Sequence, residues 1–145
     1  MFDYIYKAIT VCFLGFFPFF ELIVAIPAGI SLRLDPVSTV VFCVAGNFLP
    51  VFVIEYGYSR LIRYKRIRRW LERRVSDRLV YNVNRYGTWY VLLFTPWLGI
   101  WAVALTARIL KMNPKTLAWS SFSSLVMYSV ALVVLIQAGI DFFSR

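Results

Sequence analysis

The chain contains no histidine and few acidic residues, 7 against 16 lysines and arginines. Without histidine, neither Ser-His-Asp nor Cys-His catalysis is available, and the commonest zinc ligand is missing. The two cysteines, Cys12 and Cys43, both lie in apolar runs, which is typical of small buried side chains and not of a disulfide or metal site. There is no nucleotide-binding loop. The sequence therefore predicts no catalytic residues, no metal and no cofactor, and we do not expect an enzyme.

Polar surface is also scarce. Of the 145 residues, 61% are hydrophobic and 19% aromatic, whereas an ordinary soluble domain is about 45–50% apolar. The formal net charge of +9 comes mainly from one stretch, since nine of the sixteen basic residues lie between Arg60 and Arg78. A nucleic-acid-binding domain would not carry long apolar runs on both sides of its basic residues. These properties predict an integral membrane protein of one domain that binds no nucleic acid.

Four apolar segments follow one another, at residues 9–32, 36–58, 88–110 and 116–140. Each exceeds the about 18 to 20 residues that a helix needs to cross the hydrocarbon core. The second and fourth are typical of ordinary spanning helices. We therefore expect an all-α membrane fold.

The first and third segments contain residues that break helices. Pro18, Glu21, Pro27 and Gly29 interrupt the first, and Pro96 and Gly99 interrupt the third. Proline removes a backbone donor and clashes with the preceding turn. Half-segments of about 10 residues are about 15 Å long, so each segment is either a kinked span or a re-entrant hairpin. Broken helices at membrane depth line the binding sites of transporters, and we expect the functional site there.

An internal repeat relates these two segments. A shift of 78 positions places Phe16–Phe20 on Phe94–Leu98 and Leu32–Pro36 on Leu110–Pro114. Prolines match at both ends, and Asp-Pro meets Asn-Pro. The pattern predicts two copies of a broken hairpin followed by a spanning helix.

The basic stretch joins the two repeats. Its apolar positions recur every three or four residues from Arg60 to Tyr86, which predicts an amphipathic helix on the membrane surface that ends at Gly87. Anionic headgroups are the ligands expected there, with an acidic protein partner as the second choice. The residues predicted to bind them are Arg60, Arg63, Lys65, Arg66, Arg68, Arg69, Arg73, Arg74 and Arg78.

Charge also bears on orientation. The positive-inside rule places the basic stretch in the cytoplasm. If all four segments span, the turn containing Lys111 and Lys115 falls outside, against the rule. If segments one and three are re-entrant, that turn is cytoplasmic and the two repeats are inverted. The charges favour the inverted arrangement.

The run from Glu21 to Pro27, together with Leu34-Asp35-Pro36 and Gly46-Asn47-Phe48-Leu49-Pro50, resembles the small multidrug export protein family, which is distantly similar to the DedA/VTT membrane proteins. The resemblance implies inverted repeats of re-entrant hairpins and transport of lipids or small solutes, and the family label implies efflux of cationic compounds. The second hairpin departs from the family pattern. The stretch from Pro96 to Ala102 lacks a second proline and a Gly-Thr-Gly, and Arg108 is unusual.

Individual residues leave alternatives open. Glu21 is either a proton or cation site inside an apolar segment, or a structural group that caps a half-helix or pairs with Arg33 or Arg108. Arg108 either binds a lipid phosphate or extends to the headgroups. Asn47 and Pro50 either expose carbonyl groups or form a packed kink. Glu55 is expected to pair with Arg60 or Tyr58.

The sequence thus predicts a small transporter or lipid translocase of the DedA-like type in a prokaryotic cytoplasmic (inner) membrane, with possible proton coupling through Glu21. Its parts would be repeat one at 9–58, the basic helix at 60–86 and repeat two at 88–140. The candidate substrate or proton site comprises Glu21, Pro18, Pro27, Gly29, Asn47, Pro50, Pro96, Gly99 and Arg108. The alternative is a non-transporting subunit or assembly factor that docks on a larger complex. The small size favours a homodimer or attachment to such a complex.

Overall fold

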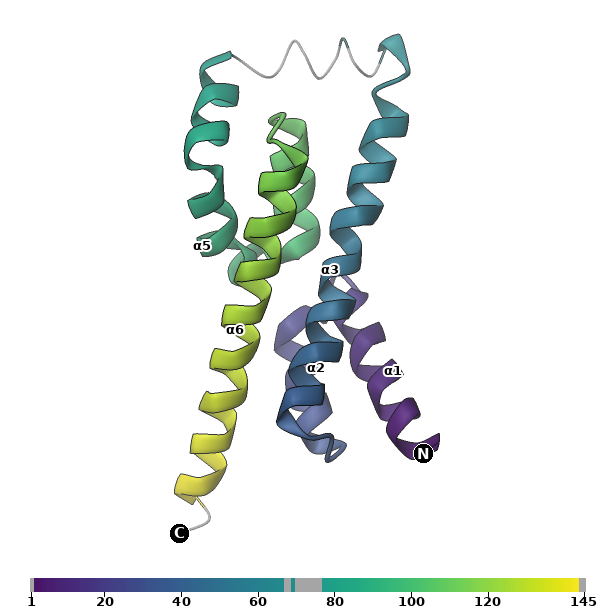
Figure 1. Cartoon of the computed structure of the whole chain (residues 1–145), viewed down its shortest axis with the longest axis vertical. Coiled ribbons are helices and arrows are strands. Elements are labelled where there is room, and N and C mark those ends of the chain that lie inside the picture. Colours follow the sequence, from purple (N-terminus) through teal and green to yellow (C-terminus); the bar gives the residue numbers. More distant parts are fainter. Residues whose placement is uncertain (1, 67–68, 70–76, 144–145) are drawn as a thin grey trace. The chain divides into compact units, whose positions relative to one another are not determined.

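The computed structural model describes residues 2–66, 69 and 77–143. Within these residues every regular element is helical and no strand occurs, which confirms the predicted all-α fold (Figure 1). The helices are α1 (Phe2–Phe16), α2 (Glu21–Ser31), α3 (Pro36–Leu61), α5 (Asp77–Ile109) and α6 (Pro114–Phe143).

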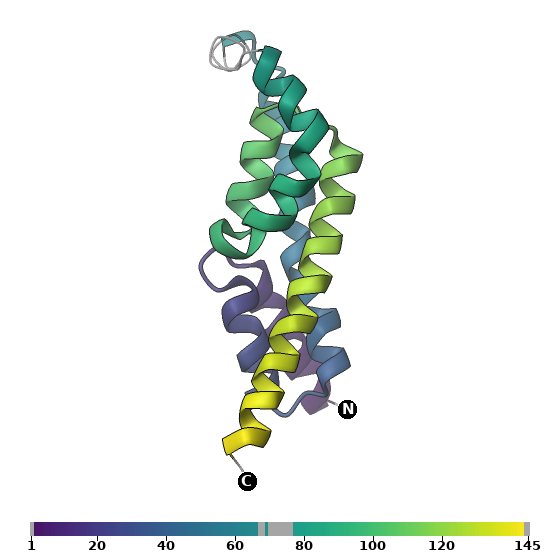
Figure 2. The ribbon, with the colours of Figure 1, turned by 90° about the vertical axis from the view of Figure 1, so that its left-hand side faces the viewer.

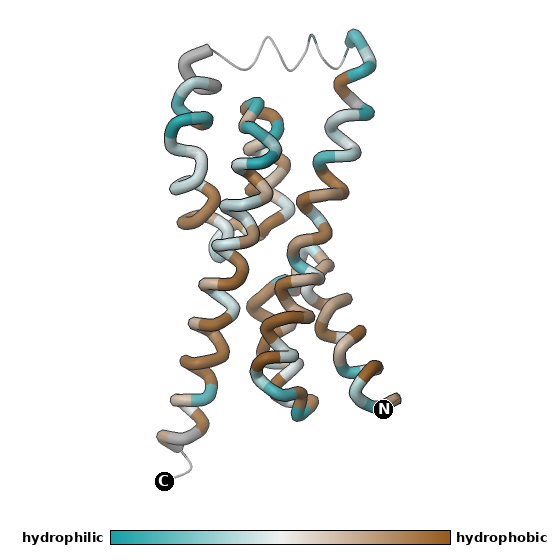
Figure 3. Tube along the Cα trace, viewed as in Figure 1, coloured by the Kyte–Doolittle hydropathy of each residue, from teal (hydrophilic) through white to brown (hydrophobic). Residues whose placement is uncertain are grey.

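Three helices are long and apolar enough to cross a membrane. By length and composition, the candidate spans are Pro36–Arg60 in α3, Tyr81–Ile109 in α5 and Pro114–Ile140 in α6. Hydrophobic residues run along α6, and hydrophilic ones gather at the C-terminal end of α3 and at the turn before α6 (Figure 3). Large apolar side chains such as Trp119 and Leu135 are exposed by 73% and 68%, which lipid accommodates and water does not. The chain is therefore an integral membrane protein.

The helices form two compact units. One comprises the residues up to Leu49 together with those from Leu125 onward, and the other comprises Pro50 to Ser124. Helices α3 and α6 each contribute residues to both units, and each unit contains one of the two broken segments.

In the first unit, segment one is two short helices and not one span. Helix α1 ends at Phe16 and α2 begins at Glu21, whose φ is 42°. The start of α1 lies beside the start of α3, because the Tyr4 hydroxyl is 2.7 Å from the Ser38 hydroxyl. Over α1 and α2 the chain therefore returns to the end of the first unit at which α1 begins.

Close backbone approach joins α1 to α3. A Cβ added at Gly46 would lie 2.0 Å from the carbonyl oxygen of Cys12, and one added at Gly15 would lie 2.9 Å from that of Cys43. Only glycine, which has no Cβ, permits these contacts. The two Cys-x-x-Gly stretches thus pack against each other at the point where the helices meet.

In the second unit, α5 is broken at Gly99, where φ is 78° and ψ is 155°. The chain doubles back there into a second limb (Figures 1 and 2). Hydrogen bonds tie the beginning of α5 to its end: Asn84 donates from Nδ2 to the Lys111 carbonyl (3.5 Å) and accepts at Oδ1 from the Asn113 N–H (3.2 Å). The start and end of α5 therefore lie at the same end of this unit.

The local backbone geometry recurs at the spacing of the sequence repeat. Among the described residues, four have a positive φ: Glu21, Arg33, Gly99 and Lys111. Gly99 follows Glu21 by 78 positions, and Lys111 follows Arg33 by 78 positions. The N–H of Arg33 donates to the carbonyl three residues back, and the N–H of the next residue donates to the carbonyl five residues back. The N–H groups of Lys111 and of the residue after it make the same two bonds. Both are helix ends of the Schellman type. The same helix-end geometry therefore occurs at both corresponding positions of the predicted repeat.

The predicted end of the amphipathic helix at Gly87 is wrong. Helix α5 begins at Asp77 and continues through Gly87. A Cβ at Gly87 would lie 3.1 Å from Sδ and Cε of Met112, so this glycine serves close packing and not helix termination. Part of the predicted helix, residues 67–68 and 70–76, lies outside the described residues.

Candidate functional site

A half-buried ion pair joins α3 to the second limb of α5. Nε of Arg108 is 2.6 Å from Oε2 of Glu55, and the side chains are exposed by 12% and 32%. The guanidinium also donates from Nη2 to Oε1 of Glu55 (3.2 Å) and from Nη1 to the Met112 carbonyl (2.6 Å). It stacks over the Tyr58 ring, 4.8 Å from the centroid. The charge of Arg108 is thus neutralised inside the unit.

The sequence predicted that Glu55 pairs with Arg60 or Tyr58, whereas in the structure it pairs with Arg108. Arg60 instead donates to the Tyr56 hydroxyl and stacks on its ring, one turn earlier in the same helix. Arg108 is 53 positions from Glu55, so the pair forms only when the limb after Gly99 folds back on α3.

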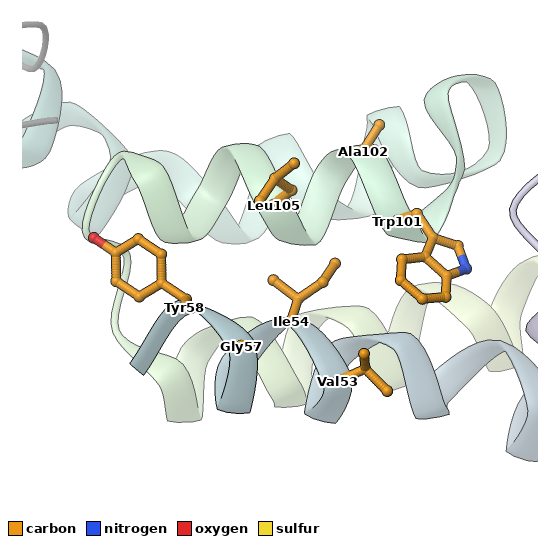
Figure 4. A pocket seen from close by; sticks show the side chains of 7 residues that line it. All are labelled: Val53, Ile54, Gly57, Tyr58, Trp101, Ala102 and Leu105. Atoms are coloured by element: carbon orange, nitrogen blue, oxygen red, sulfur yellow. The ribbon is translucent and has the colours of Figure 1, made fainter. Parts of the chain in front are cut away.

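An apolar groove of about 420 Å³ lies beside this ion pair, between α3 and the second limb of α5. Figure 4 shows the Tyr58 and Trp101 rings near its two ends and aliphatic side chains between them. The lining residues are Val53, Ile54, Gly57, Tyr58, Trp101, Ala102 and Leu105.

The predicted residues of segment one lie around the break in the first unit. Pro18 and Pro27 are exposed, and Glu21 is half-buried as the first residue of α2. Gly29 is buried, and a Cβ there would lie 2.5 Å from Cγ2 of Thr39. Glu21 lies in the first unit and Arg108 in the second, and their pairing stays a prediction.

Asn47 and Pro50 are both buried in the interior of α3. Asn47 donates from Nδ2 to the Cys43 carbonyl at 3.1 Å, and its Oδ1 is buried without a hydrogen-bond partner. Because Pro50 has no N–H, the carbonyl of Gly46 loses its helical donor.

Pro96 has the same effect in α5, where it leaves the carbonyl of Leu92 without its helical donor. Here the carbonyl is satisfied, because Ser124 donates to it from Oγ at 3.3 Å. Gly99, three residues later, provides the positive φ at which the limb reverses. The structure thus brings Pro96, Gly99 and Arg108 together with the groove in one unit.

The residues predicted to bind anionic headgroups are only partly described. Arg60, Arg63, Lys65, Arg66 and Arg69 are exposed at and after the end of α3. Arg68, Arg73 and Arg74 lie outside the described residues, and for Arg78 only the backbone is described. Headgroup binding stays a prediction.

Sequence reasoning missed the groove and the pairing of Glu55 with Arg108. One signal was available: both charges lie inside or at the edge of apolar segments, where an ionised side chain is stable only with a partner. The groove left no such signal, since its lining residues are ordinary members of apolar runs.

Residues 21–131 match the family model described as "Putative small multi-drug export protein". No curated protein and no solved structure matches the chain. The matched range includes α2, the break at Gly99, the ion pair and the groove, and it covers more than half of the sequence. The chain therefore belongs to the small multidrug export protein family.

Proposed function

We propose that this protein is a small membrane exporter of compounds that dissolve in the bilayer. The observation that carries the proposal is the pair of helix breaks at Glu21 and Gly99, which lie 78 positions apart inside apolar segments and share their positive φ. Transporters place such breaks where a substrate or coupling ion binds, because the freed backbone groups must face protein or a wet cavity. Family membership supports the same role.

In this proposal segments one and three are re-entrant hairpins, and α3 and α6 are the true spans. The contacts of Tyr4 with Ser38 and of Asn84 with Asn113 support it, because each hairpin then enters and leaves on one side. The two repeats would have opposite orientations in the membrane. The DedA/VTT relationship stays part of the proposal.

Glu21 is the proposed coupling residue. A carboxylate in a broken apolar segment binds a proton or a cation more readily than one in water. We expect Glu21→Gln to abolish the dependence of dye efflux on the pH gradient in proteoliposomes, while Asp3→Asn, which removes an exposed carboxylate at the start of α1, leaves it unchanged. Unchanged pH dependence in Glu21→Gln would exclude proton coupling through this residue.

Two other roles remain to be tested against export. A lipid translocase would move labelled phospholipid across the same proteoliposomes without any dye efflux. A non-transporting subunit, suggested by the departures from the family pattern after Pro96, would bring partners at fixed stoichiometry through purification in mild detergent. We place the protein in a prokaryotic cytoplasmic membrane as a homodimer, with anionic lipids around Arg60 and Arg63.

A further inference from the structure

The groove beside the ion pair has a lining without charge. None of its seven lining residues carries a formal charge. Arg108 stacks on the lining residue Tyr58, and it forms an ion pair with Glu55 at 2.6 Å, so these two charges neutralise each other. A cation entering the groove would find the carboxylate already paired, and an anion would find the guanidinium engaged on several sides. The lining therefore favours an uncharged ligand.

The volume of the groove suits a small molecule. The groove has about 420 Å³, which is within the range of about 300–1,000 Å³ of small-molecule sites.

The two aromatic rings favour a ligand that itself contains rings. Tyr58 and Trp101 both lie between the two helices, one toward each end of the groove (Figure 4). Aromatic rings attract other rings in offset or edge-to-face arrangements by about 0.5–1.5 kcal/mol beyond the area that they bury. A saturated lipid chain has no rings and gains nothing from this attraction between aromatic rings. Tyr58 is 8% exposed, so it is not an interfacial anchor that faces the headgroups.

Gly57 keeps the wall of α3 open. A Cβ built on this glycine would meet nothing within 4 Å, and its φ is in the ordinary helical range. Glycine is a poor helix former and needs a reason in a helix interior. No Cβ clash requires a glycine at this position, whereas Gly46 and Gly87 each meet a neighbour. The missing side chain leaves room in the groove.

From these observations we infer that the groove between α3 and the second limb of α5 binds an uncharged, ring-containing lipophilic compound. The inference rests on the proposed export function for its biological meaning, and it differs from the cationic substrates that the family label implies. Binding can be measured without transport, so the two ideas are tested separately.

The test uses benzophenone, a neutral photoreactive probe of two rings, with the full chain reconstituted in lipid nanodiscs. We expect labelling with a saturable part that maps to α3 and the limb after Gly99 by mass spectrometry. Excess biphenyl should displace that part, and the lipophilic cation tetraphenylphosphonium should not. Labelling that never saturates, or that the cation displaces as well as biphenyl does, would overturn the inference.

Gly57→Leu fills the groove without a backbone clash and should weaken the saturable labelling by about tenfold or more. Gly139→Leu is the matched control, because a Cβ at Gly139 in α6 also meets nothing within 4 Å. It should label as the wild type does. If Gly57→Leu does not fold, Ala102→Leu fills the groove from the opposite wall. Saturable labelling retained in a folded groove-filling variant would refute the site.

Efflux measured on the same variants separates this inference from the proposed function. Binding without any efflux in the wild type would contradict the export proposal and leave the site in place. Efflux that persists in a groove-filling variant without saturable labelling would show that export uses another site, and it would overturn the groove as the substrate site.

Discussion

The guanidinium of Arg108 contacts Glu55, the Met112 carbonyl and the Tyr58 ring within the second unit. We expect Arg108→Leu to lower the free energy of unfolding by roughly 2 kcal/mol. This is below the about 3–5 kcal/mol of a fully buried pair, because Glu55 is one-third exposed. Arg108→Lys should recover part of the loss, since an ammonium cannot reproduce the planar fork and the ring stacking. Denaturation by sodium dodecyl sulfate in mild-detergent micelles measures each change.

The double variant Glu55→Leu/Arg108→Leu is the control for this interpretation. If the cost of Arg108→Leu arises from an unpaired carboxylate, removing both charges should cost less than removing the arginine alone. If the double variant loses as much stability as the two single variants together, the two side chains act independently.

Asp35 provides a pH-dependent contact at the start of α3. Hydrogen bonds from the hydroxyl and the backbone N–H of Ser38 lower the pKa of this carboxyl below its ordinary value. A lowered pKa in the folded state adds stability above the unfolded value of about 3.9, and that stability is lost as the pH falls through the folded pKa. We expect the wild type to lose thermal stability on acidification below about pH 4.

Asp35→Asn is the matched variant, because Asn113 occupies the corresponding position before α6. Its Oδ1 accepts a hydrogen bond from the Lys115 N–H at 2.9 Å and so caps that helix. An asparagine at position 35 keeps the cap and removes the titrating group. Its melting temperature should depend less on pH in this range. An identical pH dependence in both proteins would assign the acid sensitivity to other carboxyl groups.

At the scale of the element, the contact of α1 with α3 depends on Gly46. Gly46→Ala would place a Cβ 2.0 Å from the Cys12 carbonyl oxygen, and only a shift of one helix relieves this clash. We expect a loss of about 1–3 kcal/mol in the free energy of unfolding. Gly139→Ala meets no neighbour and should be neutral, or stabilising by up to about 1 kcal/mol through helix propensity. If the two variants unfold alike, α1 does not pack on α3 as described.

The elements themselves were largely readable from the sequence. Apolar run length predicted α3 and α6, and the prolines and glycines predicted breaks in the other two segments, since these residues act through local backbone sterics. Gly87 shows the limit of such reasoning. A glycine after an amphipathic pattern predicts a helix end, but here it is required by Met112, a neighbour 25 positions along the chain. The pair of Glu55 with Arg108 was missed for the same reason, because contacts across a fold leave no periodicity in the sequence.

At the scale of the whole molecule, the re-entrant arrangement makes a prediction about sidedness. Asn84 bonds to the turn at Lys111, so this turn and the basic stretch should lie on one side of the membrane, as the positive-inside rule also requires. With two re-entrant hairpins only α3 and α6 cross, and both termini then lie outside. Single cysteines at positions 3, 33 and 111, in a background without Cys12 and Cys43, should distinguish the alternatives with a membrane-impermeant thiol reagent.

We expect a cysteine that replaces exposed Lys111 to react only after the cells are opened, and cysteines at Asp3 and Arg33 to react in intact cells. Co-expression of an enzyme-tagged cytoplasmic marker controls for leakage. If instead position 111 reacts in intact cells while position 3 does not, α1 with α2 and α5 must each cross the bilayer. The breaks at Glu21 and Gly99 would then be kinks within ordinary spans, and the export proposal would lose the arrangement on which it depends.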